Sequence, residues 1–197
     1  MSRPVPRPLL AVAAVVLVAA VVMVFAGGWR TGVSWDETYH VLRMRTFLGP
    51  SGWYVLDHDL HGDAPGSWVG SAYVYAPVTM LLLHAWSMLT GVDSSGVVSA
   101  SASAYAVRHL GVGLLSLPAL AAVAVLARLL LRSWAWGLVA AAALAAMPAW
   151  TGHAMFNVKD VPVATGYTLA SLGFAVVATA RAPRLLVAGA ATAAAGV

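Results

Sequence analysis

The sequence has no cysteine and very little charge, and both absences narrow the class of protein. Without cysteine, neither a disulfide nor a thiolate metal site is available. Charged residues make up 9% of the 197 residues and hydrophobic residues 61%, and the mean hydropathy is +0.84. The net charge of +4 comes from scattered arginines rather than from a basic stripe, which excludes nucleic acid as a partner. We therefore predict a protein whose surroundings are a lipid bilayer.

Long apolar runs predict helices that cross the membrane, because a transmembrane helix needs about 20 mostly apolar residues. We predict an all-α, polytopic protein of the cell membrane with about four complete transmembrane helices plus a truncated fifth. No polar flank closes the last run before Val197, so we expect the chain to be the N-terminal part of a longer protein. The five runs are residues 9–26, 104–127, 134–150, 163–180 and 185–197.

The arginines indicate how these helices are oriented, because cytoplasmic loops collect Lys and Arg. The apolar segment 72–90, broken by Pro77 and His84, decides the layout. If this segment crosses the membrane, two of the three arginine pairs that flank the spans lie on the outer side of the membrane, against the rule. If it lies at the interface, all three fall inside. We favour the interface, which gives a long outer loop at 27–103 with juxtamembrane helices and a short one at 151–161. The flanking pairs are Arg3 and Arg7, Arg128 and Arg132, and Arg181 and Arg184.

The first acidic motif, Ser34-Trp35-Asp36-Glu37, comes just after the first apolar run. In so apolar a chain, ionisable groups at the ends of spans are candidates for function. Ser34-x-x-Glu37 also matches a helix capping box, and Asp36 would favour the dipole of a helix over residues 35–48. The motif is therefore either part of a site or only a helix cap.

The second motif, residues 157–162 (Asn-Val-Lys-Asp-Val-Pro), lies between two apolar runs. Asp160 would cap the following helix, since a proline suits the first helical turn. Lys159 is the only lysine among eleven basic residues, and at the membrane boundary it could bind a phosphate or simply reach the headgroups. Two further binding candidates, each with packing or snorkelling as the alternative, are Arg108 near the outer end of its span and His153 in the same loop as Lys159.

A third cluster, Asp57-His58-Asp59-x-His61-x-Asp63, contains residue types that hold divalent cations. Its spacing matches no metal signature, so we assign no metal ligand in this chain. The alternative is a metal-dependent membrane hydrolase built on the cluster.

The order of these features resembles the GT-C membrane glycosyltransferases, in the branch of the protein O-mannosyltransferases and aminoarabinose lipid transferases. The shared features are an N-terminal span, an acidic pair that opens a long outer loop, an Arg-His helix, and a Lys-Asp-x-Pro step two spans later. The resemblance covers nearly all of the chain but only the N-terminal part of such an enzyme. We therefore expect these 197 residues alone to be inactive.

The resemblance implies transfer of a sugar from a polyprenyl-phosphate donor to a protein, lipid or glycan acceptor on the outer face. It makes Asp36 the catalytic base or acceptor-binding carboxylate, with Glu37 as its neighbour. It makes Asp160 the acidic residue of the second outer loop. Lys159 would help to hold the donor phosphate, and Arg108 would do likewise. A divalent cation is compatible with this chemistry, but nothing in the sequence demands one.

Two other interpretations stay open. A non-catalytic polytopic membrane protein would use both motifs only to cap helices. A transporter should carry charges near the middle of its spans, whereas Asp36, Lys159 and Asp160 lie at span ends. Catalysis requires the carboxylates of Asp36 and Asp160 to face one cavity, and two independent caps do not.

Overall fold

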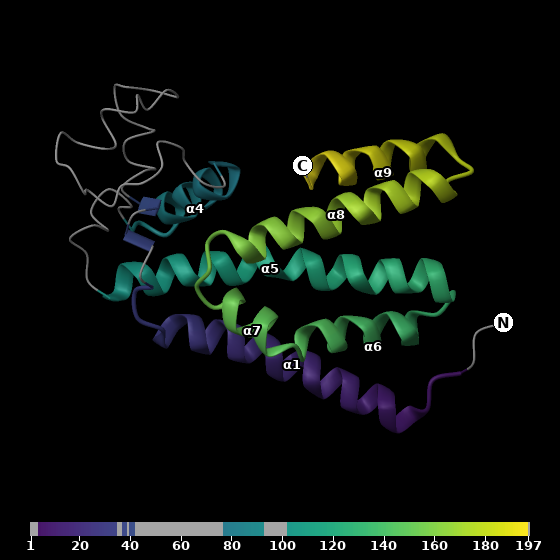
Figure 1. Cartoon of the computed structure of the whole chain (residues 1–197), viewed down its shortest axis with the longest axis horizontal. Coiled ribbons are helices and arrows are strands. Elements are labelled where there is room, and N and C mark those ends of the chain that lie inside the picture. Colours follow the sequence, from purple (N-terminus) through teal and green to yellow (C-terminus); the bar gives the residue numbers. More distant parts are fainter. Residues whose placement is uncertain (1–3, 35–36, 39, 42–76, 93–101, 197) are drawn as a thin grey trace, which may run out of the picture.

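Helices make up all the regular structure in the part of the chain that the structure, a computed structural model, describes (Figure 1). The described residues are 4–34, 37–38, 40–41, 77–92 and 102–196. The prediction of an all-α protein is confirmed for these residues, which contain no strand. The helices are α1 (Arg7–Arg30), α4 (Pro77–Leu89), α5 (Ala102–Leu131), α6 (Trp134–Ala145), α7 (Pro148–Ala154), α8 (Asp160–Thr179) and α9 (Pro183–Ala195).

The long helices run back and forth as an antiparallel bundle (Figure 1). Helix α1 packs on α5 and α6, α5 packs on α8, α8 packs on α9, and α4 contacts α5. The start of α1, the α5–α6 turn and the α8–α9 turn lie at one end of the bundle. The end of α1, the start of α5 and the α7–α8 turn lie at the other end, which we call the motif end. The end with the start of α1 we call the arginine end. It carries Arg7, Arg128, Arg132, Arg181 and Arg184.

The favoured layout requires the flanking arginines to share one end, and those in the described residues do. Helix α4 has 13 residues. At about 1.5 Å per residue this helix is about 20 Å long, short of the roughly 30 Å hydrocarbon core. Residues 72–76 and Arg3 lie outside the described residues. Which end faces the cytoplasm stays a prediction.

The predicted number of spans needs correction. Three helices in the described residues, α1, α5 and α8, are long and apolar enough to cross a membrane. A fourth span exists only if α6 and α7, which are bent by 72° relative to each other, are counted as one. The truncated fifth span was predicted at 185–197, where the structure has α9, a helix of 13 residues. The structure therefore gives a helical membrane protein with three spans, or four with the bent pair.

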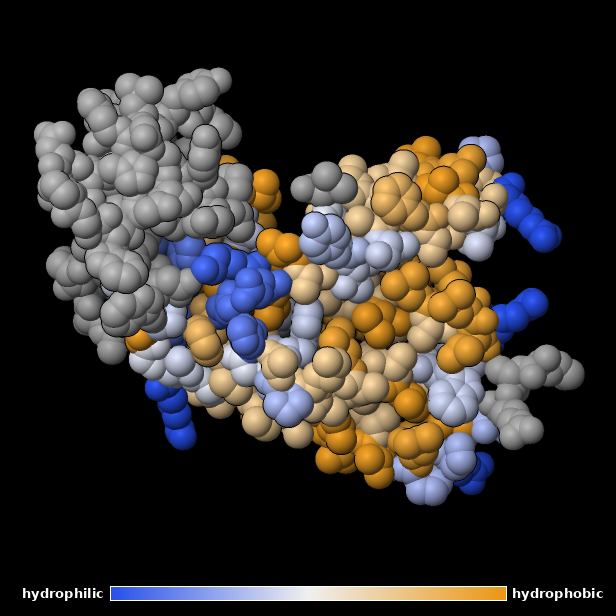
Figure 2. Space-filling model, in the orientation of Figure 1, coloured by the Kyte–Doolittle hydropathy of each residue, from blue (hydrophilic) through white to orange (hydrophobic). Residues whose placement is uncertain are grey.

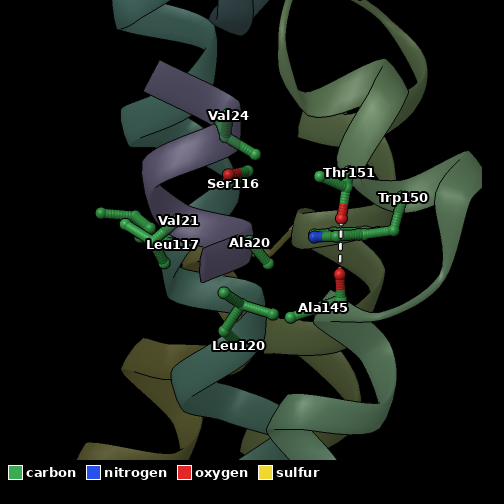
Figure 3. A pocket seen from close by; sticks show the side chains of 9 residues that line it. All are labelled: Ala20, Val21, Val24, Ser116, Leu117, Leu120, Ala145, Trp150 and Thr151. Carbon is green, nitrogen blue, oxygen red and sulfur yellow. Dashed lines mark hydrogen bonds between the residues drawn. The ribbon is translucent and has the colours of Figure 1, made fainter. Parts of the chain in front are cut away.

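The predicted span 134–150 is not one continuous helix, because it breaks before Pro148. Proline has no N–H to donate and disfavours helical geometry at the preceding residue. Met147 is accordingly extended, with φ −73° and ψ 118°. The Thr151 hydroxyl donates to the carbonyl of Ala145, one of the groups exposed by the break (Figure 3). Side-chain hydroxyls commonly satisfy the backbone in this way inside membranes.

A small apolar pocket lies beside this break, between α1, α5 and the α6–α7 pair (Figure 3). Broken helices in transporters expose backbone groups that coordinate ions. Here the Ala145 carbonyl accepts a hydrogen bond from the Thr151 hydroxyl, and the Ser116 hydroxyl donates to the Gly113 carbonyl at 2.6 Å. The pocket is therefore lined mostly by apolar side chains and gives no support to the transporter interpretation. Its lining consists of Ala20, Val21, Val24, Ser116, Leu117, Leu120, Ala145, Trp150 and Thr151.

The remaining helices extend beyond the apolar runs that predicted them. Helix α1 covers 7–30 rather than 9–26, and α5 covers 102–131 rather than 104–127. Helix α8 starts at Asp160, three residues before the predicted 163. Helix ends near the headgroups tolerate polar residues, so a count of apolar residues underestimates their length.

Small residues allow close contact between the helices, as is usual where lipid supplies no hydrophobic drive. A Cβ added to Gly137 of α6 would meet the Ala124 carbonyl oxygen of α5 at 2.6 Å. A Cβ added to Gly173 of α8 would meet the Cα of Ala193 in α9 at 2.6 Å. Apolar side chains cover the length of the bundle in Figure 2, and hydrophilic ones gather at its two ends. This pattern matches a bundle whose ends lie at the two faces of a bilayer.

Single cysteines at the two ends should react with a membrane-impermeant thiol reagent from opposite sides of the membrane. We expect Gly32→Cys, at the motif end, to be labelled in intact cells, and Ser133→Cys, at the arginine end, only after permeabilisation. The natural chain has no cysteine, so it gives no background. A Cβ at Gly32 meets no atom within 4 Å, so this variant keeps the fold. Labelling of Ser133→Cys in intact cells would show that the orientation is wrong.

Candidate functional site

A buried carboxylate and a buried imidazole form the centre of the motif end. Glu37 Oε1 lies 2.8 Å from His109 Nε2, and neither side chain has any exposed surface. Glu37 Oε2 accepts a hydrogen bond of 2.9 Å from the Ser34 backbone N–H. The predicted reach of Glu37 back to Ser34 is therefore confirmed. His109 Nδ1 lies 2.9 Å from the carbonyl oxygen of Gly28, which is in the last turn of α1 and has no partner within the helix.

These contacts fix the number of protons that the pair holds. A carbonyl oxygen only accepts, so His109 Nδ1 carries a proton and donates it to Gly28. The contact between His109 Nε2 and Glu37 needs one further proton, held by either the ring or the carboxyl group. In both arrangements the charges of the pair sum to zero.

Arg108 places a buried positive charge next to this pair. It interacts electrostatically with Glu37 and with Tyr105. Its Nη2 donates to the Met80 sulfur, a weak acceptor, at 3.2 Å. The Arg108 Nε and the Tyr105 hydroxyl are buried and have no hydrogen-bond partner among the described residues. The interaction with Glu37 offsets part of the cost of burying this cation, and the unpartnered Nε leaves a donor for the anionic group of a ligand.

One asparagine joins the polar residues of the α7–α8 turn. Asn157 Oδ1 accepts hydrogen bonds of 2.9 Å from the backbone N–H groups of Lys159 and Asp160. Asn157 Nδ2 lies 2.8 Å from Asp160 Oδ2 and 2.7 Å from His153 Nδ1. The side chains of His153 and Asp160 are 48% and 66% exposed, and the turn forms a hydrophilic patch in Figure 2. This group is therefore open to a ligand from outside the bundle.

The predicted capping role of Asp160 is wrong, because α8 already begins at Asp160. An N-cap residue precedes its helix and accepts from the first N–H groups. Here the acceptor is the Asn157 side chain, and one of its donors is the Asp160 N–H itself. The Asp160 carboxylate is thus left for other contacts, although its place in the first turn still favours the helix dipole.

Phe156 lies between the buried pair and the exposed turn. Its ring centroid is 6.5 Å from that of His109, edge to face, and 6.2 Å from that of His153, nearly parallel. Close approach of the turn to α1 depends on Gly28, where an added Cβ would meet the Met155 carbonyl oxygen at 2.9 Å. The first and second motifs, far apart in the sequence, are therefore neighbours in space.

Five of the six predicted site residues lie at this end of the bundle. The sixth, Asp36, is outside the described residues, as is the cluster at 57–63. The described ranges contain no group of three His, Asp or Glu side chains that could hold a metal ion. The structure therefore places Glu37 at the same end as the second motif, while its neighbour Asp36 lies outside the described residues. The five are Glu37 and Arg108 on the buried side and His153, Lys159 and Asp160 at the turn.

Two residues of this end had no assigned role in the sequence. In the sequence His109 stood out only as the histidine of the Arg-His helix, and Asn157 only as part of its motif. The sequence did offer one signal for Asn157. It is the only asparagine, and the chain has no glutamine. A lone amide beside a histidine and an aspartate, four residues before it and three after it, can reach both across a helix end.

No protein-family model, curated protein or solved structure matches this chain. Its function is therefore argued from the site itself.

Proposed function

We propose that the protein is a membrane glycosyltransferase that moves a sugar from a polyprenyl-phosphate donor to an acceptor at the outer face of the membrane. The observation that carries the proposal is that Phe156 links His109, the partner of Glu37, to His153, the partner of Asn157, and so connects the two motifs. Two motifs that only cap helices need not lie together. Two halves of one site must do so.

The proposed roles follow from exposure and charge. Asp36 and Asp160 are the carboxylates that face the reacting groups, and Asp160 is open to solvent. Glu37 is instead a positioning residue, since both of its oxygens are already bonded. Lys159 at the turn and the buried Arg108 are the cations for the donor phosphate, supported by the unpartnered Nε of Arg108. His153 is a hydrogen-bonding group beside them.

The proposed reaction balances with these groups alone. A hydroxyl oxygen of the acceptor attacks the anomeric carbon and forms the new glycosidic bond. The bond from that carbon to the phosphate oxygen breaks, and its electron pair leaves with the phosphate. The Asp36 carboxylate takes the hydroxyl proton as the new bond forms. Lys159 and Arg108 stabilise the negative charge that develops on the leaving phosphate.

The competing candidate is a non-catalytic membrane protein, favoured by one observation. The hydrogen bonds of Glu37 are those expected of a helix cap with a buried partner. This interpretation explains the buried pair, but it gives no reason for a buried Arg108 whose Nε has no hydrogen-bond partner.

The test is consumption of a polyprenyl-phosphate sugar by membranes that contain the full-length protein. We expect release of free polyprenyl phosphate from at least one donor in a panel of hexose and pentose derivatives, with the sugar recovered on a membrane or envelope acceptor. Membranes from cells without the protein are the control. If no donor in the panel is consumed above that control, the non-catalytic interpretation becomes the better one.

A further inference from the structure

We propose that Asn157 is the positioning residue of the exposed turn, and that its amide holds His153 in the tautomer with the proton on Nε2. The hydrogen bonds of the α7–α8 turn carry this inference by themselves. Only the use of His153 in sugar transfer rests on the proposed function. Neither the sequence motif nor the resemblance assigns Asn157 a role.

The orientation of the Asn157 amide is fixed by its backbone partners. Two N–H groups, those of Lys159 and Asp160, point at one end of the amide, so that end must be the oxygen. The other end is therefore the NH₂ group, which faces Asp160 Oδ2 at 2.8 Å. The reversed amide would set donors against donors and its oxygen against a carboxylate. All the hydrogen-bonding positions of this side chain are thus in use.

The amide orientation in turn fixes the histidine. Asn157 Nδ2 can only donate, and it lies 2.7 Å from His153 Nδ1, so Nδ1 must be the acceptor. The ring proton then sits on Nε2. The ring is also held from one side by Phe156, whose centroid is 6.2 Å away with the two rings 22° from parallel. His153 therefore offers a hydrogen-bond donor from a fixed ring to whatever enters the turn.

The same NH₂ group keeps two acceptors close together. His153 Nδ1 and Asp160 Oδ2 are 3.7 Å apart, and with the proton on Nε2 neither of these atoms carries one. They can be neighbours because one NH₂ group donates to both. The turn consequently presents a donor on His153 and the second oxygen of Asp160 on neighbouring side chains. This pairing suits a ligand with both an acceptor and a hydroxyl donor, such as a sugar phosphate.

The tautomer can be measured directly with the full chain in lipid nanodiscs. Histidine is labelled with ¹⁵N, and long-range ¹H–¹⁵N correlations show which ring nitrogen carries the proton under mildly alkaline conditions, where imidazole is neutral. His153→Gln identifies the signals of His153. We expect the wild-type ring to be protonated on Nε2. A ring protonated mainly on Nδ1 would overturn the proposal.

Asn157→Asp separates positioning from capping. The aspartate keeps an oxygen for the two backbone N–H groups, so the start of α8 is preserved. It has no N–H to donate, and its carboxylate faces the His153 ring. For the tautomer measurement it is combined with Asp160→Asn, so that an amide rather than a second carboxylate lies 2.8 Å from the new oxygen. The ring proton should therefore move to Nδ1. An unchanged tautomer in this variant would show that Asn157 is only a cap.

Sugar transfer gives a separate readout. If the proposed function holds, Asn157→Asp should also lower transfer about 10- to 100-fold, the worth of one hydrogen bond to a charged group. The expected tautomer shift without any measurable transfer by the wild type would sustain the positioning role and count against the glycosyltransferase. Transfer by the wild type without the tautomer shift would sustain the glycosyltransferase and count against the positioning role.

Discussion

Replacing Asp36 with asparagine should lower sugar transfer by the full-length protein about 100- to 10,000-fold, the range that a general base contributes. An amide keeps the shape and the hydrogen-bonding ability of the side chain but cannot take the proton of the attacking hydroxyl. The variant should still be inserted in the membrane at the wild-type level. The measurement is the initial rate of release of free polyprenyl phosphate, with the amount of protein in the membrane determined in parallel.

Asp59→Asn is the matched control, because it makes the same chemical change in the acidic cluster to which we assign no role. Its transfer rate should equal that of the wild type. Near-normal transfer by Asp36→Asn would remove the assigned base. Loss of activity in Asp59→Asn, together with dependence on a divalent metal, would favour a hydrolase built on the cluster at 57–63.

The sequence was a good guide to the bundle and a poor guide to its breaks. Long apolar runs predict membrane helices because a bilayer leaves a helix as almost the only way to satisfy the backbone. They do not predict a bend, since Met147 and the residues around it are as apolar as a continuous span. The bend at Pro148 depends on one missing N–H and on a threonine three residues later.

The contacts of the site are likewise of two kinds. Local contacts follow from spacing in the sequence, and long-range contacts do not. The bond from Glu37 to Ser34 spans three residues and follows from the capping-box spacing. The bond from Glu37 to His109 joins residues 72 positions apart, and no spacing rule gives it. The contacts of Asn157 are all within four residues, so they were open to prediction. They were missed because Asp160 is an equally good cap by residue type.

The largest loss of stability is expected from His109→Leu, at about 3–5 kcal/mol in the free energy of unfolding, the usual cost of removing one partner from a buried ionic pair. Leucine fills a similar volume but leaves the Glu37 carboxyl group buried with only the Ser34 N–H. It also leaves the Gly28 carbonyl without its donor. The measurement is reversible unfolding of the full chain in detergent micelles.

Glu37→Gln is the comparison that identifies the pair as the cause. Glutamine has the same shape, its oxygen can accept from the Ser34 N–H, and its NH₂ can donate to a neutral His109 ring. Both contacts survive, so the loss should be about 1 kcal/mol or less. The double variant should lose clearly less than the two single losses added together, because Glu37→Gln removes the charge that His109→Leu leaves stranded. Equal losses in the two single variants would instead mean that packing at the start of α5, rather than the shared proton, holds the motif end together.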